Sequence, residues 1–397
     1  MAGALDGIRV LDLAQGSFGY AGRLLAGFGA DVIKVEPRGG DPLRAWPPFA
    51  ADHPDPERGA RHLHLDGAKR SMVVDLDARE GQALLRRLVR EADALVESFT
   101  PGHLAARGLD YDRLVESRPD LVMVSITHFG QDGPYAQYAG GEIVDAALGG
   151  YLYLTGDPDR EPVKPYDDLV LQHAAVHGAV AVMAGITHRE LIGEGDHFDV
   201  AASEAALFLL GGMAQTYHFD GRVSKRVGAR LTYANPLYPY PSTIRPCRGG
   251  YVHAHSNNRH IDLLAALMQG VGMEALLDRP MGNADAIDEA MDRWMAEKDK
   301  FEVVRLAQEM RLPFTEVLTP DEVIRDPHLE ARGFFVELEH PAAPGVRQPG
   351  AAAMLTGTPW RVARAPVLAE HTDEVLGDVL GLDRAAIDAL RRDGVIA

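Results

Sequence analysis

The chain has 397 residues, of which 58 are acidic and 40 basic, so its formal net charge at pH 7 is −18. This charge argues against nucleic acid or an anionic membrane as the main partner, although a local basic cluster can still bind a phosphorylated small molecule. The length and the hydrophobic share of 46% are those of an ordinary enzyme-sized globular protein and favour two domains.

The sequence also bears on where the protein works. Its single cysteine, Cys247, cannot form an internal disulfide, which fits a reducing compartment. Cys247 lies in an expected turn at 245–250 and is a weak candidate nucleophile despite two neighbouring arginines. The first seven residues lack the basic and apolar regions of a signal peptide, and we find no apolar run of membrane-spanning length. We therefore expect a cytoplasmic protein without a membrane partner.

The first 36 residues follow the order of a dinucleotide-binding unit. We expect a strand at 8–13, a helix at 23–28 and a second strand at 31–35 that ends before Glu36. The glycines between the first strand and the helix are spaced G-x-x-G-x-x-G rather than G-x-G-x-x-G. The tight turn and the close approach to a pyrophosphate are therefore not both provided. The sequence predicts a parallel α/β start without a nicotinamide or flavin dinucleotide.

The alternation of strands and helices continues to about residue 126. We expect strands at 72–76, 94–97 and 121–126, and a helix at 80–91. This order predicts an α/β fold with a doubly wound, mostly parallel sheet, whose ligands lie outside the carboxyl ends of the strands. The residues at these strand ends are Gln15, Gly16, Ser17, Glu36, Ser98, Phe99 and His128.

Features near these strand ends allow a structural and a functional interpretation. Residues 37–69 form a long loop rich in proline, glycine and charge, which indicates a covering lid or a functional loop. Lys69 and Arg70 precede a strand, where a basic pair is usually solvated and a phosphate contact is the alternative. His128 is more often a hydrogen-bonded structural histidine than a base.

Two carboxylates, Asp167 and Asp168, stand directly before the apolar run that begins at Val170. Aspartate is a favoured helix N-cap and negative charge suits the positive end of a helix dipole, so capping is the simpler interpretation. Glu142, at the start of an expected short helix, has the same alternative. We expect the helix after Asp168 to run to Glu190 and another long helix to start at 198–204.

The composition of the sequence changes near residue 220. Residues 222–242 are rich in tyrosine and proline, and residues 249–254 are typical of the second strand of a hairpin. With helices expected at 261–268 and 284–295, this region is predicted to be a smaller α+β domain, and residues 312–317 to begin the C-terminal stretch. The aromatic residues Tyr238, Tyr240 and Trp46 form either pocket walls or surface packing.

Together these segments resemble the class III coenzyme A transferases, the group of formyl-CoA and carnitine CoA-transferases, over essentially the whole chain. The matching motifs follow the family's order along the sequence, which argues against a chance likeness. They are GADVIKVEP at 29–37, GDPLR at 40–44, KRS at 69–71, VESFTPG at 96–102, FGQDGPY at 129–135, DPHL at 326–329 and EHTDEVL at 370–376.

The resemblance implies a fold and an assembly. A large Rossmann-like domain is expected from residues 1–200 together with the returning residues 326–397. A linker helix at 201–224 leads to a small α+β domain at 225–325. The resemblance also implies an interlocked homodimer in which each ring-like chain threads the other.

The resemblance further implies an activity. The family's covalent nucleophile is an aspartate before a buried helix, and the matching residue is Asp168. Its carboxylate attacks an acyl-CoA thioester, an acyl-aspartyl anhydride and an aspartyl-CoA thioester follow, and an acceptor acid reverses these steps without ATP. Glu142 matches an acidic residue near the nucleophile. Each attack forms an oxyanion, for which Gly16, Ser17 and the segment Gly249-Gly250 are candidate donors.

The implied ligands are CoA, as a moiety of substrate and product, and a carboxylic acid, with no permanently bound cofactor and no metal. The residues that match the nucleotide end of CoA are Arg38, Lys69, Arg70, Ser98 and Phe99, and Trp46 matches nearer the acyl end. Arg107 is a further phosphate candidate, displaced by one residue from the family's pattern.

Two alternatives stand against CoA transfer. The α-methylacyl-CoA racemases share the aspartate, but their second base is a histidine at the position of Gly141, and we find no replacement in the motif. A partner subunit that binds CoA without turnover would lack the nucleophile, whereas Asp168 is present. We therefore expect a CoA-transferase, whose donor and acceptor acids the sequence does not identify.

Overall fold

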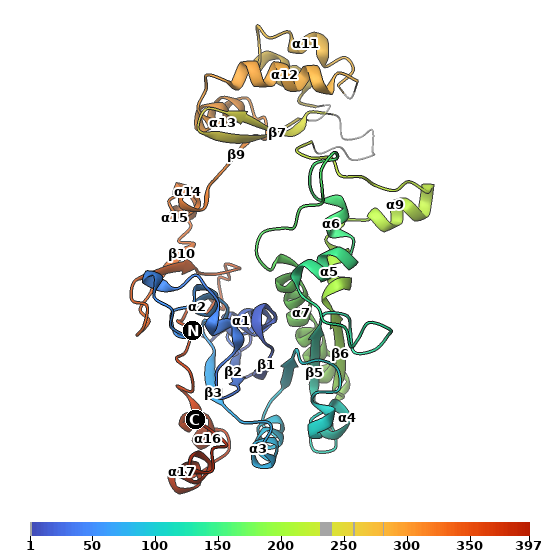
Figure 1. Ribbon diagram of the computed structural model, residues 1–397. Helices are drawn as coiled ribbons and strands as arrows, with labels where there is room; N and C mark the ends of the chain where they lie inside the picture. The colour runs from blue at the N-terminus through green and yellow to red at the C-terminus, as the bar shows by residue number, and fades with distance from the viewer. Residues whose placement is uncertain (1, 231–239, 257–258, 281) are drawn as a thin grey trace. The chain divides into compact units, whose positions relative to one another are not determined.

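The chain folds into two compact units (Figure 1). The computed structural model describes residues 2–230, 240–256, 259–280 and 282–397, so Tyr238 lies outside the described residues. The larger unit comprises Met1–Gly150, Tyr166–Gly211 and His328–Ala397, and the smaller unit comprises Tyr151–Pro165 and Gly212–Pro327. Residues 151–165, assigned above to the large domain, belong to the smaller unit.

A six-stranded parallel sheet forms the centre of the larger unit. The register pairs Leu11 with Ile33 on one side and with Leu95 on the other. The strands lie in the order β3-β2-β1-β4-β5-β6, which is a doubly wound order with its switch point between β1 and β4. The predicted mixed α/β fold is therefore confirmed. The strands are β1 (Arg9–Leu13), β2 (Asp31–Glu36), β3 (Arg70–Val73), β4 (Ala94–Glu97), β5 (Val122–Thr127) and β6 (Asp196–Ala201).

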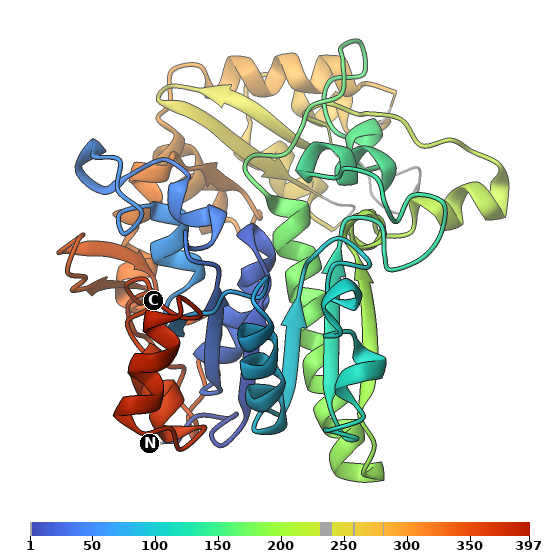
Figure 2. The ribbon, with the colours of Figure 1, turned by 60° about the horizontal axis from the view of Figure 1, so that its bottom comes forward.

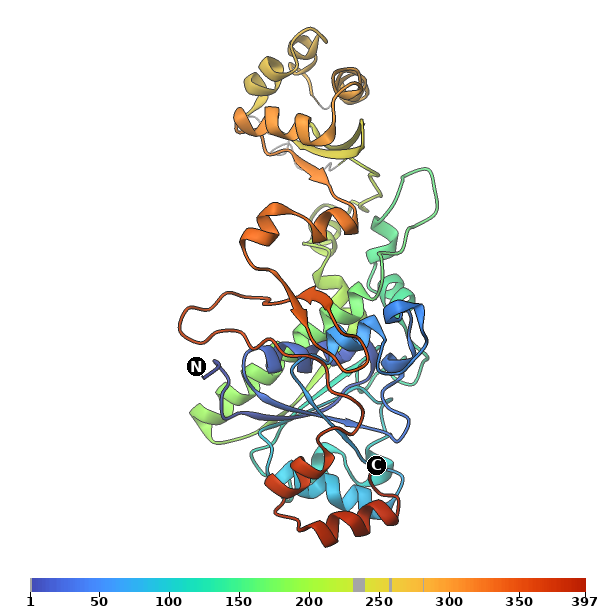
Figure 3. The same cartoon turned by 90° about the vertical axis from the view of Figure 1, so that its left-hand side faces the viewer.

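Helices cover both faces of the sheet, because its strands present apolar side chains to both sides (Figures 2 and 3). On β1, Val10 packs in the layer of α1, α7 and α8, whereas Leu11 and Leu13 pack in the layer of α3, α4, α16 and α17. The bounds are α1 (Tyr20–Gly27), α3 (Arg79–Arg90), α4 (Tyr111–Leu114), α7 (Leu169–Ile192), α8 (Ala202–Phe208), α16 (Thr372–Asp378) and α17 (Arg384–Arg392).

The longest of these helices, α7, has 24 residues and is long and apolar enough by composition to cross a membrane, with a mean hydropathy of 1.6 over a window of 18 residues. The expectation that no apolar run has this length was wrong. One side of the helix packs into the protein core, where Gly178 lies against Ile126 and Gly185 against Val122 of β5. A helix that packs on a sheet can thus be as apolar as a membrane-spanning helix, and only its packing distinguishes the two.

Segments distant in sequence complete the larger unit. The outer edge of β3 meets residues 371–372, where the amide of His371 donates to the Ser71 carbonyl at 2.9 Å. Val74 forms a bridge with Ile396, next to it along the same edge. The remaining elements are η1 (Gly16–Gly19), η2 (Pro42–Ala45), η3 (Ala50–Asp52), α2 (Ala60–Leu65), η4 (Ala105–Arg107), α5 (Glu142–Leu148), α15 (Pro327–Ala331), β10 (Phe335–Leu338) and β11 (Val346–Pro349).

The smaller unit is built around a three-stranded antiparallel sheet. Val252 and Ala254 of the central strand pack with Leu264, Met291 and Phe314 into its core. The order is β7-β8-β9, with β7 (Ser242–Cys247), β8 (Gly250–His255) and β9 (Thr315–Val317). The helices are α6 (Tyr151–Leu154), α9 (Met213–Asp220), α10 (Ile261–Leu267), α11 (Met273–Leu276), α12 (Ala284–Met295), α13 (Lys300–Glu309) and α14 (Pro320–Ile324).

Several expected elements differ from the structure. Residues 198–200 belong to strand β6 and only the short α8 follows, so the long helix expected there is absent. Residues 201–224, expected as one linker helix, contain α8 and α9 with Gly211 and Gly212 between them. Cys247 ends β7 instead of lying in a turn, and residues 315–317 form the third strand of the small sheet rather than the start of the C-terminal stretch.

Candidate active site

Asp168 occupies the N-cap position of α7, but its side chain does not cap the helix. Its Oδ2 instead accepts a hydrogen bond from the Ser17 hydroxyl at 2.7 Å and one from Nη1 of Arg61 at 3.2 Å. Ser17 is buried in η1, directly after β1. The Asp168 carboxylate therefore faces the loop at the carboxyl end of β1, where a doubly wound sheet binds its ligands.

Glu142 performs the capping that was expected of Asp168. Its side chain is buried at the first position of α5 and accepts hydrogen bonds from the backbone amides of Val170 and Leu171, both at 3.1 Å to Oε2. A carboxylate at this place also satisfies the positive end of the α7 dipole. Glu142 thus lies near Asp168, because it contacts the first turn of α7, the helix that Asp168 precedes.

Arg61 of α2 connects the two aspartates. Its Nη1 donates to Asp168 and its Nη2 to Oδ1 of Asp167. The guanidinium also lies over the ring of Trp46, with 5.1 Å between Cζ and the ring centroid. Sequence analysis marked the loop 37–69 but not Arg61 itself, because no motif or periodicity distinguishes this arginine from others. Trp46, which was expected near the acyl end, is linked to Asp168 through Arg61.

The glycine candidates for oxyanion donors are placed differently. Gly16 adopts a positive φ of 58° at the start of η1, and its amide already donates to Oδ1 of Asp41 at 3.1 Å. Gly249 and Gly250 connect β7 and β8 in the smaller unit. Among the candidates in the larger unit, the hydroxyl of Ser17 is the one that donates to Asp168.

The side chains of Lys69 and Arg70 are held by carboxylates of the fold. The ammonium group of Lys69 is fully buried, and its three donors are used by Asp12 at 2.8 Å, Asp66 at 2.9 Å and the Gly19 carbonyl at 2.7 Å. Arg70 pairs with Asp31 at 2.6 Å. Both side chains hold buried or half-buried carboxylates of the fold, and we do not carry them forward as phosphate ligands.

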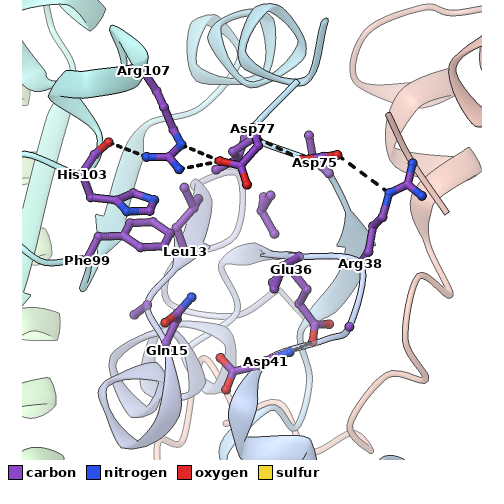
Figure 4. Close-up of a pocket in the computed structure, with 16 residues that line it drawn as sticks. Leu13, Gln15, Glu36, Arg38, Asp41, Asp75, Asp77, Phe99, His103 and Arg107 are labelled. Atoms are coloured by element: carbon purple, nitrogen blue, oxygen red, sulfur yellow. Dashed lines mark hydrogen bonds and ion pairs between the residues drawn. The ribbon is translucent and has the colours of Figure 1, made fainter. Parts of the chain in front are cut away.

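A cavity of about 450 Å³ lies at the carboxyl ends of β1, β2, β3 and β4 (Figure 4). Three residues predicted to contact CoA, Arg38, Phe99 and Arg107, line it. The ring of Phe99 stacks on His103 with 4.4 Å between centroids, and Nη1 of Arg107 donates to the His103 carbonyl at 2.9 Å. Ser98 lies beside this cavity, and its hydroxyl accepts from the Gln15 amide at 2.8 Å.

Acidic side chains share the cavity with these cations. Arg107 forms an ion pair with Asp77, and Arg38 lies 3.9 Å from Asp75. Figure 4 shows both arginines at the rim, each turned toward its aspartate. Burial raises the pKa of Glu97, at the end of β4, to about 7, although the Phe99 amide donates to its carboxylate at 2.7 Å.

Two further clusters of titratable groups lie in the larger unit. His128 Nδ1 is 2.6 Å from Asp145, whose pKa is raised by burial, so His128 is hydrogen-bonded as expected of a structural histidine. The side chains of Glu57, His62 and His340 converge within 4.8 Å in the manner of metal ligands. Arg44 already lies among them, 2.9 Å from Glu57 and 3.1 Å from His62. This guanidinium supplies the positive charge that a metal ion would bring to the cluster.

The model of CoA-transferase family III matches residues 5–372. The chain belongs to this family. A succinate–glutarate CoA-transferase of Agrobacterium fabrum is 34% identical, with 96% of this chain and 97% of that protein covered. A succinyl-CoA–D-citramalate CoA-transferase of Chloroflexus aurantiacus is 31% identical over 99% and 98% of the two chains. The resemblance found in the sequence is thus confirmed, and the protein is a CoA-transferase of family III.

Solved structures agree with this family III assignment. The crystal structure of a CAIB/BAIF family protein from Brucella suis has a TM-score of 0.85 and 28% sequence identity, covering 96% of this chain and all of that one. Rv3272 from Mycobacterium tuberculosis, with a TM-score of 0.79 and 24% identity over 94% and 99% of the chains, shares the fold.

Proposed function

We propose that this family III enzyme moves CoA from an acyl-CoA thioester to a carboxylic acid through covalent intermediates on Asp168. The observation that carries the proposal is the division of tasks at the start of α7. Glu142 caps the helix, whereas the Asp168 carboxylate is held by Ser17 and Arg61 on the loop side. A carboxylate in that position can serve as a nucleophile, because the helix start does not depend on it.

The reaction has four balanced steps. The Asp168 carboxylate attacks the thioester carbonyl, forming a mixed anhydride and releasing the CoA thiolate. The thiolate then attacks the Asp168 carbonyl of the anhydride, forming an aspartyl-CoA thioester and releasing the donor's carboxylate. An acceptor carboxylate attacks that thioester, which regenerates an anhydride and a thiolate. The thiolate finally attacks the acceptor's acyl carbonyl, and the Asp168 carboxylate is restored.

The neighbours of Asp168 have distinct roles in this scheme. The Ser17 hydroxyl, 2.7 Å from Oδ2, can donate to the oxyanion that forms at the Asp168 carbonyl when the thiolate or an acid attacks it. Glu142 is a positioning residue, since it fixes the first turn of α7 through two amides. We assign the nucleotide end of CoA to the cavity lined by Arg38, Phe99 and Arg107.

Two names among the relatives suggest which acids to try first. The Agrobacterium fabrum protein is named for succinate and glutarate, and that of Haloarcula hispanica for succinyl-CoA and mesaconate. We therefore propose succinyl-CoA as the first donor to test and glutarate as the first acceptor. Succinate, the acid that this donor releases, and glutarate are both dicarboxylates.

The test is mass spectrometry of the enzyme after incubation with succinyl-CoA. We expect a CoA adduct on the peptide that contains Asp168, which hydroxylamine releases and borohydride reduces, and which is absent in Asp168→Ala. Asp167→Ala is the matched control, because it removes the neighbouring carboxylate and keeps the nucleophile. Lack of any adduct with a panel of acyl-CoA thioesters, at full structural integrity, would contradict the covalent route.

The racemase alternative is an outcome of the same test. The residue at the position of the racemase histidine is Gly141, which has no side chain and precedes α5. Exchange of the α-proton of a branched acyl-CoA in deuterated water, without an adduct on Asp168, would favour the racemase over CoA transfer.

We further propose that the enzyme works as an interlocked homodimer in the cytoplasm. The larger unit has exposed apolar side chains on three helices that pack against one another, α5, α7 and α8. Such a surface is unusual for a monomer and typical of a subunit interface. The side chains are Ile143, Val144, Leu148, Val176, Val180, Leu207 and Phe208.

A further inference from the structure

Arg61 holds an unusual combination of partners. One arm of its guanidinium contacts Asp168, the other contacts Asp167, and its plane lies over Trp46. The guanidinium keeps its positive charge at all physiological pH values. Its side chain is 30% exposed and that of Asp168 is 14% exposed, so the pair is only partly screened by water.

The proposed reaction moves one negative charge past this arginine. The charge is on Asp168 in the free enzyme, on the CoA thiolate in the anhydride state, and on the free acid in the aspartyl-CoA state. Acylation thus removes the charge from the partner of Nη1, while Asp167 and Trp46 still hold the rest of the guanidinium in place. At that stage the acid carboxylate is the anion that remains to be bound.

The geometry of the attack on Asp168 directs the acid toward Nη1 of Arg61. To attack the Asp168 carbonyl carbon, an acid oxygen must approach it to about 3.5 Å or less. Nη1 of Arg61 lies 3.2 Å from Oδ2 on that carboxyl group. An acid oxygen that approaches the carbonyl from the side of Arg61 can therefore come within hydrogen-bond reach of Nη1, and a charge-assisted bond can form there without moving the arginine.

We propose that Arg61 is a catalytic residue that binds the reacting carboxylate of the acid substrate, exchanging Asp168 for the acid each time Asp168 is acylated. This inference rests on the proposed covalent function of Asp168. In this inference Nη1 binds the acid, and Asp167 anchors the guanidinium through Nη2. An arginine that only positioned Asp168 would accelerate the attack on the aspartyl-CoA thioester equally for an acid and for a neutral nucleophile.

The first experiment separates these two roles. The aspartyl-CoA enzyme is formed with succinyl-CoA, freed of released succinate, and mixed either with increasing glutarate or with neutral hydroxylamine. In Arg61→Gln we expect the half-saturating glutarate concentration to rise about 10- to 100-fold, the loss of one charge-assisted hydrogen bond. Cleavage by hydroxylamine should change less than about twofold. Arg113→Gln, which breaks an exposed pair with Glu116, is the control and should match wild type.

The outcomes are distinct. Equal slowing with glutarate and with hydroxylamine would leave Arg61 as a positioning residue, and an unchanged glutarate dependence would remove it from the reaction; either overturns the inference. Absence of the adduct in wild type would instead overturn the proposed function. If Arg61→Gln does not fold, Arg61→Lys takes its place in the experiment. It retains the charge but not the second arm, so its half-saturating glutarate concentration should lie between those expected for wild type and for Arg61→Gln.

A binding measurement tests the same exchange without turnover. In Asp168→Asn the side chain is neutral, as in the acylated state, so Nη1 has lost its anionic partner. We expect this variant to bind glutarate about 10-fold more tightly than wild type in calorimetry, and the gain to disappear in Asp168→Asn/Arg61→Gln. A gain that persists in the double variant would contradict the role of Arg61.

Discussion

At the residue scale, the start of α7 is served by two carboxylates with separate tasks. Glu142 accepts the first amides of the helix, and Asp168 accepts from Ser17 and Arg61. In the proposed cycle Asp168 is acylated and restored in every turnover. The cap is therefore supplied by a residue whose chemistry does not change, and the first turn of α7 can stay intact throughout the reaction.

Glu97 carries a prediction for stability against pH. Burial raises its pKa from 4.5 to about 7, so the folded state binds its proton more tightly than the unfolded state does. Its contribution is fully present below about pH 4.5 and is lost as the pH rises through 7. We expect Glu97→Gln to exceed wild type in unfolding free energy at pH 8, by on the order of 2 kcal/mol, and to equal it at pH 4.5.

Denaturant titrations at several pH values measure this difference. The exposed Glu302→Gln is the control and should show no difference that grows with pH. A Glu97→Gln variant that is less stable than wild type at pH 8 would mean that the carboxylate is ionised and well solvated there, contrary to the prediction.

Residues at the site were predictable to different extents. The resemblance directed attention to Asp168, Glu142 and Ser17, which the structure brings together. Lys69 could not be assigned from sequence, because its partners Asp12 and Asp66 only meet it after folding. Arg61 carries no motif, and its role depends on a contact with a residue 107 positions later.

At the element scale, the parallel sheet was predictable because buried parallel strands appear as short apolar runs between helices. Strand β6 was missed for a physical reason. It lies at the edge of the sheet with three of its six residues half-buried and two exposed, and a helix-forming segment follows it from Ala202. Local helix propensity therefore dominated a segment whose extended form depends on pairing with β5.

The packing of α7 on β5 gives a second prediction. A methyl group at Gly178 would overlap the Ile126 side chain, closer than van der Waals contact. We expect Gly178→Ala to lower the unfolding free energy by about 1 to 3 kcal/mol, since overpacking outweighs the gain in helix propensity. Thermal unfolding checks this against Gly377→Ala in α16, where the methyl group meets only the Leu382 carbonyl at 4.0 Å. Equal melting temperatures for the two variants would refute the close approach.

At the scale of the whole molecule, the family could be recognised from sequence because its motifs extend from one end of the matched region to the other. The acids could not be identified from sequence, because no motif marks Arg61, the side chain to which we assign acid binding. The expected assembly also depends on the surface that the folded chain exposes rather than on any local pattern.

The apolar surface of α5, α7 and α8 predicts the assembly state. We expect sedimentation equilibrium to give twice the mass of one chain, and Val180→Glu, which places a charge at a 63% exposed position of this surface, to shift the protein toward monomers. Ala385→Glu on α17 is the control, since it adds the same charge on the opposite layer of the sheet. A monomeric wild type at micromolar concentration would contradict the proposal.

The closing of the β3 edge has a consequence for biosynthesis. Ser71 and Val74 pair with residues near 371 and with Ile396, about 300 positions later. During translation, residues 1–150 and 166–211 of the larger unit leave the ribosome before residues 212–327 of the smaller unit and well before the segment that covers this edge. The nascent chain must therefore hold an open strand edge, a template for pairing with other chains, until residues 328–397 have been made.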